Sequence, residues 1–215
     1  MTTKDDCPHH HERRRLYRCV LIGLSCFIVL ILLIIFLTWL ILRPTKPSFI
    51  LQDATVYGFN VTGPGLMGPN ALTTAIQITV AARNPNERVG IFYDRLDVFA
   101  TYRGQQVTLP TLLPESYQGH KDVTVWSPFL SGSSVPVAPY LAVELGQDQN
   151  AGTVLIHIRV DGRIRWKVGT FVSGRYRLFA NCPAYLSFGG QYSPDSILVG
   201  STSKYQLVQT CHVEV

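Results

Sequence analysis

The sequence lacks the short motifs by which most known catalytic chemistries are recognised. It has no nucleophile elbow, no pair of histidines at zinc-ligand spacing and no glycine-rich loop of the kind that holds phosphate. His120, His157 and His212 are isolated from one another along the chain. We therefore expect a protein that is not an enzyme, and we predict no cofactor and no structural metal.

Charge is absent from a stretch of about 24 residues, Cys19 to Leu42, which Arg18 and Arg43 flank. A helix of this length extends about 36 Å, enough to cross a hydrocarbon core of about 30 Å. A cleaved signal peptide has a shorter apolar core, followed by small residues. Here bulky residues, including Trp39, occupy that end. We predict that residues 19–42 form a single transmembrane signal-anchor helix.

Positive charge is distributed unequally around this span. Lysine and arginine occur at Lys4, Arg13, Arg14, Arg15 and Arg18 before it, but only at Arg43 and Lys46 in the next twenty residues. Because lysine and arginine favour the cytoplasmic side, residues 1–18 are expected to be a cytoplasmic tail. The remainder is then lumenal or extracellular, which is a single-pass type II topology. This compartment excludes nucleic acid as a partner, although the net charge is +5.

The sequon Asn60-Val61-Thr62 agrees with this orientation, because N-glycans are added only on the translocated side. We predict that Asn60 is glycosylated.

Cysteine is scarce in the outer part of the chain, where only Cys182 and Cys211 occur. In an oxidising compartment an even pair predicts a disulfide. A tetrahedral metal site is disfavoured, because two cysteines without a histidine pair at ligand spacing cannot complete four ligands. The alternative that remains open is two buried free thiols.

The amino-terminal tail has features of its own. Cys7 and Cys19 are candidates for palmitoylation. The run Cys7-Pro8-His9-His10-His11 contains metal-binding side chains, but a solvated tail is the preferred interpretation. The arginines beside the span would attract anionic lipid, so the bilayer is the first expected partner.

Apolar and polar residues alternate with period two throughout the outer part. The clearest segments are 75–81, 93–102, 122–126, 176–180 and 205–215. Glycine, proline, asparagine and serine separate them, as is typical of strands joined by turns. We expect a mostly β fold, a small antiparallel sandwich of about seven strands with one helix, similar to immunoglobulin or fibronectin domains. Residues 43–52 are predicted as a linker and 53–215 as the domain.

The segment Thr153–Val168 contains Asp161-Gly162, which ordinarily indicates a two-residue hairpin. A hairpin there would mix apolar and charged residues on one face. A continuous strand instead places all the aliphatic residues and Trp166 on one side. We predict one long strand, bent or bulged at Gly162.

The other face of this strand is basic. It carries His157, Arg159, Arg163, Arg165 and Lys167. Such a face could attract an acidic polysaccharide, anionic headgroups or an acidic protein, and the alternative is that the charge serves only solubility.

The predicted helix precedes the strand. Val137–Leu145 has Pro139 near its first turn and Leu141 and Leu145 on one side. We expect the helix to end at Asn150 to Gly152, and Gly146 is an alternative, earlier end.

Three motifs, in this order, give the chain a family resemblance. They are Asn84-Pro85-Asn86 followed by Val89 to Asp94, then Tyr117-Gln118-Gly119-His120-Lys121, and the segment around Gly162, Val160 to Gly169. With the short tail and single span, they resemble the plant harpin-induced-like and non-race-specific-disease-resistance-like proteins, of late embryogenesis abundant group 2. From the residues alone, we interpret the first motif as a rigid break between strands and the second as a loop.

The resemblance implies a plasma membrane protein of plant defence or stress response with a small sandwich domain and no catalytic residues. Two functions follow from it. Either the outer domain contacts a partner protein or the acidic polysaccharide of the cell wall, or the protein stabilises membranes during dehydration without a specific partner.

Overall fold

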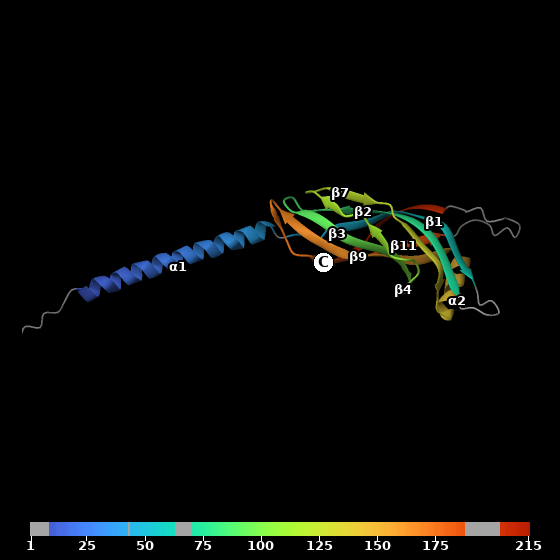
Figure 1. Cartoon of the computed structure of the whole chain (residues 1–215), viewed down its shortest axis with the longest axis horizontal. Coiled ribbons are helices and arrows are strands. Elements are labelled where there is room, and N and C mark those ends of the chain that lie inside the picture. Colours follow the sequence, from blue (N-terminus) through green and yellow to red (C-terminus); the bar gives the residue numbers. More distant parts are fainter. Residues whose placement is uncertain (1–8, 43, 63–69, 188–202) are drawn as a thin grey trace, which may run out of the picture. The chain divides into compact units, whose positions relative to one another are not determined.

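The structure is a computed structural model that describes residues 9–42, 44–62, 70–187 and 203–215 (Figure 1). The chain divides after Arg43 into a helical unit and a β unit, and each is described by itself.

The helical unit is one continuous helix, α1, His9–Leu42. Its segment Tyr17–Leu37 is long and apolar enough to cross a membrane, and none of it is buried. This exposure distinguishes it from the core helix of a soluble protein. The helix ends at the predicted residue but begins earlier, so residues 9–18 of the predicted tail are helical.

The β unit contains seven strands of eight or more residues among the described ranges. They are β1 (Ser48–Thr62), β2 (Ala71–Arg83), β3 (Gly90–Tyr102), β8 (Phe129–Pro136), β9 (Thr153–Val168), β11 (Tyr176–Ser187) and β12 (Ser203–Thr210). Shorter strands are β4 (Gln105–Gln106), β5 (Thr111–Leu113), β6 (Ser116–Gln118), β7 (Val123–Trp126), β10 (Phe171–Val172) and β13 (His212–Glu214). The sequence predicted about seven strands, which agrees with the number of long strands; the short strands were not predicted.

The strands form two antiparallel sheets. One has the order β12-β1-β2-β7, with β8 also on β2. The other has the order β13-β11-β9-β3-β4, with β5 and β6 also on β3 and β10 on β9. Figure 1 shows β3 and β9 side by side. Buried side chains from both sheets form one hydrophobic core, which confirms the predicted sandwich.

The predicted linker is too long. β1 begins at Ser48, and Phe49 and Leu51 are fully buried in the core. Buried and less buried residues already alternate from Phe49 onward, so residues 48–52 belong to the domain.

The long strand is confirmed, since β9 has the predicted bounds and no hairpin at Asp161. The irregularity lies in the neighbouring strand. Tyr93 pairs with Ile164 and Arg95 with Arg163, so Asp94 is the extra residue of a bulge in β3. A Cβ on Gly162 would meet the Arg95 carbonyl oxygen and Leu96, and Gly162 is therefore required by the bulge.

The second helix, α2, spans Pro139–Asn150 and buries Leu141 and Leu145, as predicted. Gly146 does not end it. Tyr102 donates a hydrogen bond to Asp148 (2.6 Å) and so ties the end of β3 to this helix.

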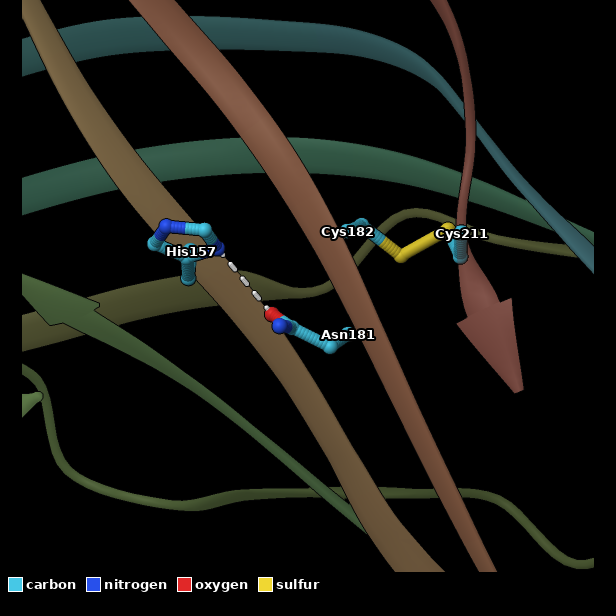
Figure 2. Close-up of a disulfide and its surroundings, with 4 residues drawn as sticks. All are labelled: His157, Asn181, Cys182 and Cys211. Carbon is cyan, nitrogen blue, oxygen red and sulfur yellow. Dashed lines mark hydrogen bonds between the residues drawn. A yellow bond between two sulfur atoms is a disulfide. The ribbon is translucent and has the colours of Figure 1, made fainter. Parts of the chain in front are cut away.

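At Cys211 the chain passes from one sheet to the other, from β12 to β13. The Cys211 amide donates to the Phe49 carbonyl of β1 (2.9 Å), whereas His212 pairs with Asn181 of β11. Cys211 is joined by a disulfide to Cys182, and their Cα atoms lie 4.2 Å apart (Figure 2). The disulfide thus fastens the crossover to β11.

Candidate functional site

Three arginines form a row across the outer face of the second sheet. Arg163 of β9 pairs with Arg95 of β3 on one side and with Arg177 of β11 on the other. Neighbouring strands are about 4.8 Å apart, and like charges directly opposite one another are destabilising. A row of this kind therefore costs stability unless carboxylates or a ligand compensate it.

A shallow hollow surrounds this row. It is lined by Arg95, Asp97, Asp161, Gly162, Arg163, Arg175, Tyr176 and Arg177. We call these residues, together with Asp94 and Arg165, the arginine face. Five guanidinium groups and three carboxylates leave two positive charges in excess.

Asp94 is the centre of the ion pairs in the arginine face. Its carboxylate accepts hydrogen bonds from Arg165 Nη2 (2.6 Å) and from Arg175 Nε (3.1 Å). Burial alone would raise the pKa of Asp94, but these two arginines outweigh it and hold the pKa below its usual value. Asp94 can make both contacts because it is the bulge residue, which depends on Gly162.

The remaining carboxylates compensate the row only in part. Asp97 pairs with Arg95 (3.1 Å) and Asp161 with Arg177 (3.0 Å), and both arginines are largely exposed. Arg163 is exposed and forms no ion pair within the described ranges. The arginine face therefore offers one free guanidinium between two weakly paired ones.

The basic face predicted from the sequence needs correction, because its four cations are not equivalent. Arg165 is held by Asp94 and is not a free cation. Lys167 lies over the Tyr117 ring, 4.9 Å from its centroid, and Arg159 lies over the Phe179 ring at 5.8 Å. Arg163 alone of the four keeps the predicted free and exposed position.

Sequence reasoning missed Arg95, Arg175 and Arg177. Arg95 follows a bulge that shifts the strand alternation, and Arg175 precedes β11. The available signal was the cluster of arginines in 175–177, close after the basic strand.

The family motifs have structural roles. Asn84, fully buried, donates hydrogen bonds to the Val89 and Gly119 carbonyls, both at 2.8 Å. Asn86 donates to the Thr45 carbonyl and accepts from the Thr45 amide, both at 2.7 Å. The first motif is the predicted break between β2 and β3, and in addition it holds residue 45.

The second motif is only partly a loop. Tyr117 and Gln118 belong to β6, which pairs with β3. Gln118 is fully buried, accepts from the Tyr93 hydroxyl (2.8 Å) and donates to the Ala82 carbonyl (2.6 Å). Burial raises the pKa of Tyr93 far above its usual value, so this hydroxyl stays a donor. His120 and Lys121 follow on an exposed turn.

The other predicted site residues have these positions. Asn60 is exposed on β1, Cys19 is exposed on α1, and Cys7 lies outside the described residues. His157 forms a hydrogen bond with Asn181 (3.2 Å), next to the disulfide (Figure 2). Within the described ranges, no group of three metal-binding side chains occurs.

Comparison with known proteins identifies relatives of this chain. A family model described as "Late embryogenesis abundant protein" matches residues 79–182. In Arabidopsis thaliana, NDR1/HIN1-like protein 1 is 52% identical over 98% of this chain and 99% of its own length, and NDR1/HIN1-like protein 12 is 53% identical over all of both chains.

Among solved structures, a putative late embryogenesis abundant protein studied in solution is 16% identical over 82% of this chain and 87% of its own, with a TM-score of 0.29. A TM-score this low supports no further conclusion. Identity above one half over the full length is decisive by itself. The chain therefore belongs to the NDR1/HIN1-like family of late embryogenesis abundant proteins, and it is a protein of plant stress and defence.

Proposed function

We propose that this protein is anchored in the plasma membrane by α1, as a single-pass type II protein, and that its extracellular domain binds acidic cell-wall polysaccharide through the arginine face. The role is binding and not catalysis. The observation that carries the proposal is the row Arg95, Arg163 and Arg177.

The chemistry of the row suits carboxylates. A guanidinium presents two parallel N–H groups to one carboxylate, and such charge-assisted pairs are stronger than neutral hydrogen bonds. An acidic polysaccharide repeats its carboxylates along a chain, as the row repeats its arginines across the strands. Binding would relieve the repulsion within the row, which Asp97 and Asp161 only partly compensate.

The membrane part of the proposal is supported by the exposed, apolar segment Tyr17–Leu37 and by the excess of lysine and arginine before it. The disulfide between Cys182 and Cys211 fits an oxidising compartment. The charge distribution and the disulfide both favour a β unit outside the cytosol.

The test measures binding of the full-length protein in nanodiscs to polygalacturonate. Arg163→Gln should lower the affinity about tenfold, the loss expected when a charge-assisted hydrogen bond of about 1.5 kcal/mol is removed. Replacing Arg95 and Arg177 as well should abolish binding, and added salt should weaken the wild-type interaction.

The matched control is Arg83→Gln, which removes an exposed arginine from the other sheet. Methyl-esterified polymer, which lacks the charge, is the ligand control. If Arg83→Gln and Arg163→Gln lower the affinity for polygalacturonate equally, the attraction is non-specific and does not depend on the arginine face. Binding of an acidic protein but not of polygalacturonate would assign the face to a protein partner, and binding of neither would favour the partnerless membrane-stabilising role.

A further inference from the structure

One end of the β unit is built from segments that are distant in the sequence. Residue Thr45 exchanges two hydrogen bonds with Asn86, and the Lys121 amide donates to the Asn86 carbonyl (3.1 Å). Gly90, at the start of β3, pairs with Lys167 near the end of β9. Because this pairing is antiparallel, residues 168–171 lie at the same end as residues 84–89. We call segments 44–46, 84–89, 119–122 and 168–171 the proximal end.

The proximal end is the part of the domain closest in sequence to the apolar helix. Only Arg43 and Pro44 separate Leu42, the last residue of α1, from Thr45. In the proposed topology, α1 spans the bilayer. Two intervening residues then keep Thr45, and whatever is hydrogen-bonded to it, near the headgroup layer.

Among the residues of the β unit whose exposure is described, the most exposed aromatic ring is at this end. Phe171 is 71% exposed, at the first position of β10. Its hairpin is rigid, because the Ser173 amide donates to the Trp166 carbonyl (2.8 Å) and the Trp166 amide donates to Ser173 Oγ (2.9 Å). An apolar side chain that this hairpin holds in water gains no free energy from burial. It gains that free energy only if a lipid bilayer or another protein covers it.

The same end of the β unit also carries exposed cations. Lys46, Arg88 and Lys121 are exposed, and Glu87 pairs with Lys121 at 3.1 Å. Exposed aromatic and basic side chains together are typical of surfaces that rest on the interface of a bilayer.

We propose that the proximal end is a lipid-binding surface: the Phe171 ring enters the headgroup region of the bilayer that holds α1, and Arg88 and Lys121 contact phospholipid phosphates. The proposal rests on the membrane anchoring proposed above, but not on polysaccharide binding.

The experiment uses Phe171→Trp in the full-length protein, reconstituted in phosphatidylcholine nanodiscs that contain lipid brominated close to the headgroup. The new indole should lose emission to the bromine, in excess of the parent chain. Phe129→Trp is the matched control, because Phe129 is half exposed on β8 and pairs with Gln77, about 20 Å along β2 from Arg83. It should show no excess quenching.

The cations are tested by adding phosphatidic acid to the nanodiscs. Quenching of Phe171→Trp should increase with this anionic lipid, and Arg88→Gln with Lys121→Gln should remove the increase. An unchanged response in that double variant would overturn the assignment of the phosphate contacts.

The parent chain separates the two proposals. Trp39 lies in the predicted span, whereas Trp126 and Trp166 lie in the β unit. The quenching that the parent chain loses on Trp39→Phe therefore reports whether α1 is inserted. If Trp39 is not quenched, the proposed membrane anchoring is wrong. If Trp39 is quenched but Phe171→Trp is quenched no more than Phe129→Trp, the lipid-binding surface is wrong and the anchoring stands.

Discussion

Asp94 shows how one residue organises the charged face. It lies at a bulge, which turns its carboxylate toward Arg165 and Arg175. The bulge in turn requires a glycine at position 162 of the neighbouring strand, since a Cβ there would meet the Arg95 carbonyl. The family glycine therefore acts through packing, and it sets the geometry of ion pairs on another strand.

The Asp94 ion pairs predict a pH dependence of stability. The pKa of Asp94 is lower in the folded than in the unfolded state, so its stabilising contribution is complete above about pH 4 and is lost as the pH falls through the lowered folded value. Denaturant unfolding of wild type and Asp94→Asn should therefore differ most near neutral pH. The difference should shrink in acid. A gap between the two proteins that is constant down to about pH 2 would contradict the prediction.

Among the elements, β9 combines an apolar and a charged face in one strand. Trp166 is buried, at 7% exposure, whereas Arg163 on the opposite face is exposed. Trp166→Ala should destabilise the domain by about 3–5 kcal/mol, because truncation leaves a cavity in the core. Arg163→Gln, in the same strand, should change stability by no more than about 0.5 kcal/mol. Thermal unfolding of both variants provides the measurement, and equal losses would argue against two distinct faces.

The sequence predicted elements whose signal is local. β9 has strict alternation through Asp161 and Gly162, and α2 has a first-turn proline followed by two leucines at helical spacing. Gln118 was predicted in a loop, because its partners Tyr93 and Ala82 lie far away in the sequence. For the same reason the pairing of Arg165 with Asp94, 71 residues apart, could not be predicted.

For the whole molecule, the side of the membrane on which the β unit lies is the main prediction still to be tested. Asn60 is exposed on β1, so a glycan there would not disturb the core. Glycosidase treatment of the membrane fraction should increase gel mobility, and Asn60→Gln should abolish the change. Protection of the outer domain from protease in intact protoplasts would overturn the topology.

The disulfide has a mechanical consequence. A protein held in the membrane at one end and bound to the wall through its domain, as proposed above, would carry tension. The disulfide Cys182–Cys211, whose cysteines are 29 positions apart in the sequence, keeps the segment between them from extending. In single-molecule pulling from residue 44 to the carboxyl terminus, reduction should lengthen the unfolded contour by about 100 Å, at about 3.5 Å per residue. Equal contour lengths before and after reduction would show that the bridge carries no load. If the proposed wall binding is correct, the oxidation state of this one cysteine pair sets how far the domain can extend when the wall and the membrane separate.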